Sequence, residues 1–484
     1  MSNSDRYGTQ SPNSTANPKC EKSGTEEMSS IDRISNLPDS ILLHILSFLP
    51  TKAVAATGVL SKRWKLLWTS FPCFDFDDSD YKAGFISAVN TIMLQHYSGS
   101  IQKFRIKCKT FYCVDVEPWI KKAILRNVQE LDLHFDSVTM MFKLPRNTFT
   151  SKTLVVLKLR SEGVTITVPW AAYMPNLKIL ELDSVRYQDD ESLSDLISCC
   201  LVLESLTILR SWNDNVGKLR IHSSTLKSLK VHPGGEYYED ERNRVIRDEV
   251  ALDINSPVLQ YLDIKDCFSG SLLISNIGSL NNANLEVHNF LSCQSLIKCF
   301  EAFQNVKFLS LAGGVSQEIL NLESGLPSLT FLNLTHLTMG FRCGWRPMLP
   351  YFLQWFENLE VLKLTDDKYY SVIDENHLWN DPAIVPRCLI SCLRIISIVV
   401  SGESDCELGM LKYMLKHGNV LQAVEIHGAD WSHGQQKCCI HGIGEEACVL
   451  EGNFLRSERY NRKLQTRLNL ADVRTEDHGR VSIC

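Results

Sequence analysis

The chain has 484 residues, of which 44% are hydrophobic, so it is long enough to form a large core or several domains. Its formal net charge of −6 argues against a general binder of nucleic acid or anionic membranes, which would carry a basic excess. The 17 cysteines are odd in number and spread over a long chain, so they do not predict a small secreted domain held by disulfides.

Residues 1–30 form a polar first segment that is rich in Ser, Asn and Thr. The segment lacks the apolar stretch of a secretory signal and is predicted to be disordered. No run of about 18 apolar residues occurs in the chain, so no membrane-spanning helix is expected. We therefore expect a nuclear or cytoplasmic protein.

Three short helices are predicted between residues 37 and 70. Pro38 and Asp39 suit a first helical turn, Pro50 ends this helix, and Gly58 separates the second helix from the third. A unit of about 40 residues buries too little surface to be stable alone, so we expect another protein to cover it, with Trp68 packing in the core. Apolar residues recur at helical spacing: Ile41, Leu42, Ile45, Leu46, Leu49, Leu60, Trp64, Leu67 and Trp68.

The order of these residues is more specific than their spacing. The sequence "LPDSILLHILSFLPTKAVAATGVLSKRWKLLW" resembles the F-box over residues 31–76, through Leu-Pro at 37–38, Leu-Pro at 49–50 and "VLSKRW" at 59–64. The resemblance implies docking on a Skp-type adaptor of a cullin–RING (SCF) ubiquitin ligase. Some of the matching residues must also hold the three helices together. The docking residues that the resemblance implies are Leu37, Pro38, Ile41, Leu42, Ile45, Leu46, Leu49, Pro50, Val59, Leu60 and Trp64.

A short repeat begins at residue 101: apolar, two residues, apolar, one residue, apolar. Copies start 23 to 34 residues apart, which overlaps the leucine-rich-repeat (LRR) period of about 20–29. One or two copies would indicate only buried strands, whereas twelve in order favour a solenoid. The copies start at Ile101, Val128, Leu154, Leu177, Leu203, Leu226, Leu259, Val306, Leu329, Leu359, Leu393 and Leu421, with a weaker copy at Asn282.

The predicted fold is therefore α/β: an N-terminal three-helix F-box, then an LRR solenoid over residues 101–384 with a parallel sheet on its concave face. The Asn or Cys expected two residues after the last leucine is mostly missing, so we expect an irregular horseshoe. Residues 234–249 read as an inserted charged loop, for which solvation is favoured over a target contact.

The outward residues of the predicted strands indicate what this face binds. The middle outward position carries mixed charges, whereas a surface that tracks phosphates would carry a run of Lys and Arg, so nucleic acid is not an expected partner. The outward position two residues earlier is apolar in the C-terminal half. It is a candidate target-binding stripe, for which the alternative is packing under neighbouring loops. The residues are Tyr261, Phe308, Phe331, Val361 and Ile395.

Residues 385–426 read as strand, strand, helix, strand, and Gly418 is placed to end the helix. The sequences "CLISCLRIISI" and "LKYMLKHGNVLQAVEI" resemble the FBD module found after the repeats in many plant F-box/LRR proteins. The module would continue the solenoid, and it implies architecture rather than chemistry.

Residues 427–484 are predicted to form a poorly ordered tail. Its potential soft-metal ligands include no CxxC pair and match no standard zinc module, so neither a metal site nor a cofactor is predicted. These ligands are His427, His433, Cys438, Cys439, His441 and Cys448.

No G-x-S-x-G, H-E-x-x-H or G-x-x-x-x-G-K-[ST] motif occurs, so no enzyme is expected. We predict a non-catalytic substrate-recognition subunit of an SCF-type E3 ubiquitin ligase, whose F-box binds a Skp-type adaptor and whose repeats bind a target protein. The alternative is an LRR protein-binding scaffold that acts without a ligase. A metal or nucleic-acid function of the tail is a third hypothesis.

Overall fold

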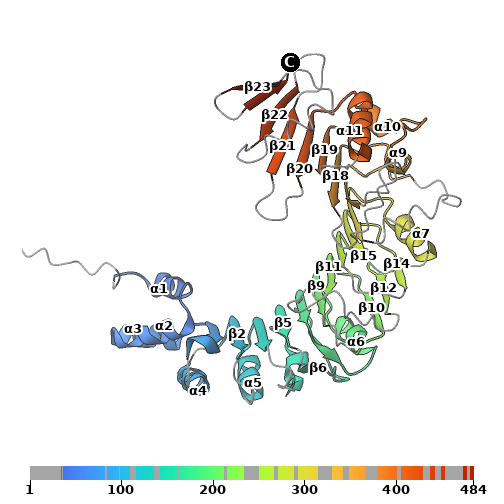
Figure 1. The fold of residues 1–484 in the computed structure, drawn as a ribbon. Helices are drawn as coiled ribbons and strands as arrows, with labels where there is room; N and C mark the ends of the chain where they lie inside the picture. Colours follow the sequence, from blue (N-terminus) through green and yellow to red (C-terminus); the bar gives the residue numbers. More distant parts are fainter. Residues whose placement is uncertain are drawn as a thin grey trace, which may run out of the picture.

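The protein is a curved arc with a small helical unit at its N-terminal end (Figure 1). The segment 1–30 and the loop 234–249, for which sequence predictions were made above, lie outside the described residues. The structure, a computed structural model, describes residues 34–483 apart from 35, 82–83, 98, 110–115, 136–141, 162, 212–214, 234–249, 266–270, 288–292, 314–329, 342–347, 367–378, 401–404, 429–435, 442–447, 453–472 and 477–479.

The N-terminal unit has three helices, as predicted. The Pro50 backbone is extended and separates the first helix from the second. Ser61 caps the third, because its Oγ accepts the Trp64 N–H. The Arg63 guanidinium donates to Asp39 Oδ1 at 2.6 Å, which ties the third helix to the start of the first. The elements are α1 (Asp39–Leu46), α2 (Thr51–Ala56), η1 (Thr57–Val59) and α3 (Lys62–Thr69).

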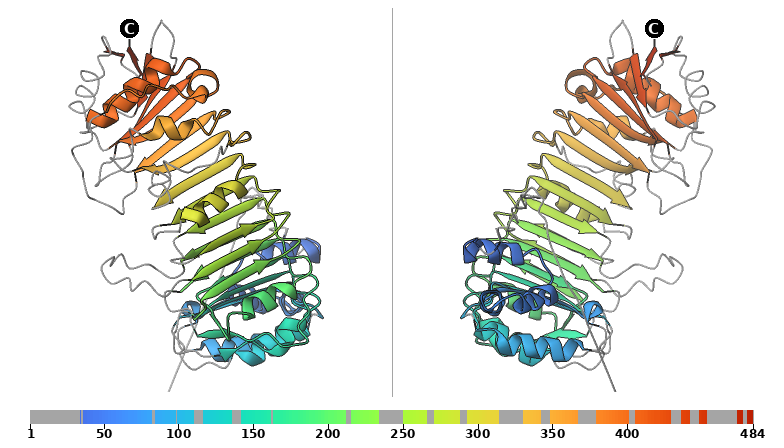
Figure 2. Two further views of the ribbon diagram at one scale, coloured as in Figure 1. Left: turned by 90° about the vertical axis from the view of Figure 1, so that its right-hand side faces the viewer. Right: turned by 90° about the vertical axis from the view of Figure 1, so that its left-hand side faces the viewer.

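A long parallel sheet lines the concave side of the arc (Figures 1 and 2). Each strand of this sheet pairs in parallel with the strand that follows it in the order given in the next sentence, which confirms the predicted solenoid sheet. In order they are β1 (Cys73–Asp77), β2 (Lys103–Cys108), β3 (Glu130–Phe135), β5 (Val156–Arg160), β7 (Ile179–Asp183), β9 (Ser205–Arg210), β11 (Ser228–Pro233), β13 (Tyr261–Lys265), β15 (Asn282–Val287), β16 (Phe308–Gly313), β17 (His336–Phe341), β18 (Val361–Asp366), β19 (Ile395–Val400) and β20 (Ala423–Gly428).

Helices and two small parallel sheets cover the convex side (Figure 2). The small sheets are β4 (Phe142–Lys143), β6 (Val164–Ile166) and β8 (Arg186–Tyr187), and β10 (Lys218–His222), β12 (Ala251–Asn255) and β14 (Leu272–Ser275). The helical segments are η2 (Asp78–Asp80), α4 (Phe85–Gln95), α5 (Glu117–Leu125), η3 (Arg146–Thr150), α6 (Ser192–Ser198), α7 (Cys293–Ala302), α9 (Leu349–Leu353), α10 (Arg387–Ser391) and α11 (Asp405–His417).

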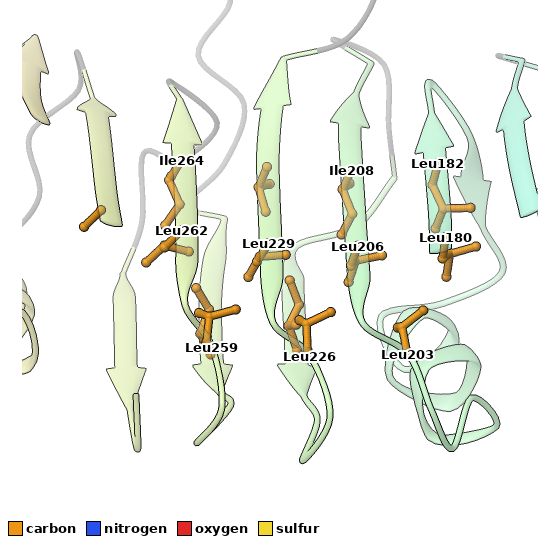
Figure 3. Close-up of a cluster of buried hydrophobic side chains, with 14 of the residues drawn as sticks. Leu180, Leu182, Leu203, Leu206, Ile208, Leu226, Leu229, Leu259, Leu262 and Ile264 are labelled. Atoms are coloured by element: carbon orange, nitrogen blue, oxygen red, sulfur yellow. The ribbon is translucent and has the colours of Figure 1, made fainter. Parts of the chain in front are cut away.

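The core between these layers consists of apolar columns that the repeat pattern predicts (Figure 3). Leu180, Leu206, Leu229 and Leu262 follow one another in the strand register and are at most 1% exposed. Burying each such side chain contributes about 2 kcal/mol, so the stacked repeats stabilise one another.

Two copies of the repeat were assigned to the wrong residues. In "LTFLNLTHLTM" the pattern fits both Leu329 and Leu334, and the structure uses the second, because Thr335 and His336 donate their N–H groups to Lys307 O. The strand β17 therefore begins at His336. The weaker copy is also shifted, since Ala283 and Leu285 pair with the inward Leu262 and Ile264 of β13, so that the copy begins at Leu280.

The C-terminal part continues the sheet. The first strand predicted in the FBD-like module is instead the helix α10, whereas the helix and the two later strands were placed correctly as α11, β19 and β20. Four antiparallel strands follow within residues 427–484. They are β21 (Gln436–His441), β22 (Cys448–Gly452), β24 (Arg480–Ile483) and β23 (Val473–Glu476).

The N-terminal helices share one core with the repeats. Thr51 Oγ1 accepts the Asp75 N–H at 2.6 Å, which joins α2 to β1, and β1 is the first strand of the sheet. Buried side chains run without interruption from Leu42 through Trp68 to Phe74 and the first repeats. The chain itself therefore covers part of the apolar surface for which we expected another protein.

A buried histidine fixes this junction. His96 is 1% exposed, and its Nε2 lies 3.0 Å from Phe71 O while its Nδ1 lies 2.6 Å from Arg126 Nη1. Because a guanidinium only donates, Nδ1 accepts and Nε2 carries the proton. Burial and the Arg126 charge lower the His96 pKa to about 4, so the ring is neutral at pH 7.

Candidate docking surfaces

The three N-terminal helices present an exposed apolar surface, which we call the helical surface. Of the docking residues that the F-box resemblance implies, seven lie on it: Pro38, Ile41, Ile45, Leu49, Pro50, Val59 and Leu60. Val59 is 88% exposed, although it is fully apolar. An exposed patch of this kind is typical of a protein interface.

Two residues of this surface were missed from the sequence. Phe48 is 75% exposed and Leu66, on α3, is 70% exposed. A helical spacing argument would have found Phe48, because Ile41, Ile45 and Phe48 recur at intervals of four and three, although α1 itself ends at Leu46.

Four predicted docking residues lie elsewhere. Leu42 and Leu46 are 0% and 1% exposed in the core of the chain itself, so we remove them from the docking surface. Leu37 and Trp64 are partly buried and pack against that core. Trp68 is buried, which confirms its predicted role in core packing.

The first part of the concave face carries a ladder of ion pairs. In register, Asp75, Arg105, Asp132, Lys158 and Glu181 alternate in sign over β1, β2, β3, β5 and β7. Every Asp, Glu, Lys and Arg on the concave face of these strands has a partner within 3.4 Å. The pairs are Asp75–Arg105, Arg105–Asp132, Asp77–Lys107, Lys103–Glu130, Lys158–Glu181 and Arg160–Asp183.

The ladder also perturbs protonation. The hydrogen bond to Glu181 raises the pKa of Lys158 more than burial lowers it. At Asp132 the effect of burial is the largest and raises the carboxyl pKa, although the charges of Arg105 and Lys158 act in the opposite direction. The ladder thus pairs opposite charges with one another along this half of the face.

The residues predicted to form a target-binding stripe lie exposed or partly exposed at strand starts, with one exception. Tyr261 and Phe308 are exposed, and Val361 and Ile395 are partly exposed, each at the start of its strand. Phe331 is fully buried ahead of β17 and packs against the rings of Phe300 and Phe356, so its assignment to the stripe is wrong.

His336 takes the place that we gave to Phe331. Strand register puts Phe308, His336, Val361 and Ile395 side by side on β16 to β19. The His336 ring lies 4.6 Å from the Phe308 ring, centre to centre. The four side chains form a continuous row.

A polar cluster lies between the ladder and this row. Asp263 is 6% exposed, and its Oδ1 lies 2.9 Å from His232 Nε2 and accepts from Asn284 Nδ2 at 2.7 Å. The Tyr261 hydroxyl donates to its Oδ2 at 3.3 Å. Burial would raise the Asp263 pKa, but the His232 and Asn284 contacts prevail and lower it. The carboxylate is therefore internally satisfied.

The described residues contain no group of three or more His, Cys, Asp or Glu placed to hold a metal ion. The tail histidines and cysteines named from the sequence have no described side chains. No described helix is long and apolar enough to cross a membrane.

Comparisons with known proteins match all three parts of the chain. The F-box domain matches residues 34–76, the LRR repeats of FBD-associated F-box protein At5g56370 match residues 116–364, and the FBD matches residues 381–426.

Relatives that match this chain over most of its length occur in Arabidopsis thaliana. F-box/FBD/LRR-repeat protein At3g52680 is 32% identical over 416 residues, covering 81% of this chain and 84% of its own length. F-box/FBD/LRR-repeat protein At5g56420 is 30% identical over 395 residues, with 80% and 89% covered. F-box/LRR-repeat protein 13 is 30% identical over 418 residues, with 82% and 89% covered.

Proposed function

Because this chain belongs to the plant F-box/FBD/LRR-repeat family, we propose that it is the substrate-recognition subunit of an SCF-type E3 ubiquitin ligase. The helical surface binds a Skp-type adaptor, and through it a cullin–RING ligase. The concave face of the repeats binds the target protein.

The observation that carries this proposal is the apolar helical surface. Ile41, Ile45, Phe48 and Val59 are large apolar residues that the folded chain leaves exposed, on elements that match the F-box. Burying them in an interface gives the free energy that docking requires.

The proposed role needs no catalytic residue. Tethering a target beside a ubiquitin-loaded enzyme raises the effective concentration of the target's lysines, so that transfer resembles an intramolecular step. The chain then contributes two binding surfaces and the stacked repeats between them.

Pull-down of a purified Skp-type adaptor by the full chain tests the proposal. We expect association of the wild type and a loss of more than tenfold in affinity for Ile45→Asp, because the charge would be buried in an apolar interface. Leu273→Asp on β14 is the matched control, since Leu273 and Ile45 are both 42% exposed.

Failure of the wild-type chain to bind the adaptor, while a known F-box protein binds under the same conditions, would overturn the proposal. It would favour a scaffold that uses the repeats without a ligase. Leu46→Asp is unsuitable for this test, because Leu46 is buried and the variant would unfold the helices.

A further inference from the structure

The concave face has two chemically different parts. The ion-pair ladder over β1 to β7 satisfies its own charges, so a partner would have to displace those pairs to reach them. Further along, Phe308, His336, Val361 and Ile395 form a mainly apolar row that is exposed or partly exposed on the concave face.

An exposed lysine, Lys363, accompanies this row. Lys363 lies on β18 two residues after Val361, so both side chains point to the concave side. Its register neighbours are Thr338 on β17 and Ser397 on β19, which carry no charge. We call Phe308, His336, Val361, Ile395 and Lys363 the β16–β19 patch.

Lys363 has no counter-ion within the part of the chain that the structure describes. Lys265 on β13, by contrast, holds Glu286 on the next strand at 3.0 Å. Lys230 on β11 also lacks an ion pair among the described residues, but it is partly buried and lies five strands from Lys363.

We propose that the β16–β19 patch binds a segment of the target protein in which a carboxylate side chain lies beside apolar side chains; this rests on the proposed function. The carboxylate pairs with Lys363, and the apolar side chains pack on the row from Phe308 to Ile395.

Strand geometry sets the length of this segment. Four strands about 4.8 Å apart span about 14 Å, the length of four or five extended residues. The row and Lys363 are separated by two residues along the strand, about 7 Å, so the carboxylate belongs next to the apolar residues and not at a distant position.

A phage-displayed library of random 12-residue peptides, selected on the full chain in complex with its adaptor, tests this inference. We expect enrichment of Asp or Glu adjacent to aromatic or branched apolar residues. Lys363→Glu should lower the affinity of a selected acidic peptide about tenfold and shift a new selection towards Lys and Arg. Phe308→Ala should weaken the same peptide about tenfold without changing the charge preference.

Lys152→Glu is the matched control, because Lys152 is an exposed lysine outside the concave strands. Adaptor binding is measured on every variant. If the chain binds its adaptor but selects no peptide, selects peptides without acidic residues, or keeps full affinity after Lys363→Glu, the inference is wrong while the proposed function stands. If the wild type does not bind its adaptor, the proposed function itself fails.

Discussion

Acidification should loosen the junction between the F-box helices and the repeats through one residue, His96. The neutral ring accepts from Arg126 and donates to Phe71 O. A protonated ring would lose its acceptor and place a second cation beside Arg126. The folded pKa of about 4 is below the ordinary value of 6.5, so the unfolded chain takes up the proton first.

Proton linkage gives the sign and the size of the change in stability with pH. Stability from His96 is fully present above pH 6.5 and is lost as the pH falls from 6.5 towards 4. The full difference corresponds to about 3 kcal/mol, at about 1.4 kcal/mol per pKa unit. Between pH 7 and pH 5 the loss of stability is about 2 kcal/mol, which corresponds to a roughly 30-fold larger population in which the junction is open.

Hydrogen exchange of peptides that span residues 69–97 reports this opening, because the Tyr97 N–H bonds Thr69 O across the junction at 2.9 Å. His96→Gln keeps a donor and an acceptor but cannot titrate, so about 2 kcal/mol of the pH dependence should disappear. His44→Gln, at an exposed site on α1, is the control and should keep the pH dependence of the wild type. If His96→Gln loses as much protection as the wild type between pH 7 and pH 5, the reasoning fails.

Two further predictions concern packing and charge. Gly409→Ala would bring its Cβ into a clash with the Trp379 ring, so we expect about 1–3 kcal/mol of destabilisation in urea denaturation; an unchanged midpoint would contradict this contact. Lys158→Glu should cost about 1 kcal/mol or less, since both partners in its pair with Glu181 are more than a third exposed. Lys158→Glu combined with Glu181→Lys should recover most of that loss, and the effect should shrink in 1 M salt.

The repeat architecture was predictable because each copy contributes two inward apolar residues at fixed spacing. Register was not predictable where two copies overlap. "LTFLNLTHLTM" offers two equivalent patterns, and backbone hydrogen bonds to Lys307 O on the preceding repeat select the second. Phe331 was misplaced for that reason, and His336 was missed.

The helical surface was only partly predictable for a different reason. On α1 the face with Ile41 and Ile45 and the face with Leu42 and Leu46 are both apolar. Helical periodicity separates two such faces but does not say which one the chain buries. That choice depends on the packing of α1 on α3 and on the continuous core with β1, both of which bring together residues distant in sequence.

The continuous core bears on the proposed mechanism. A flexible connection between the adaptor site and the target site would spread the target's lysines over a large volume and dilute their effective concentration. Here Thr51 bonds the first strand of the sheet, His96 and Arg126 lock the following segment, and the strands continue in register from β1 to the β16–β19 patch. The distance between the helical surface and the patch is thus set by stacked repeats rather than by a linker. Loosening the junction by acidification should therefore reduce ubiquitin transfer to a bound target more than it reduces either binding step, and a proportional loss of binding would contradict this coupling.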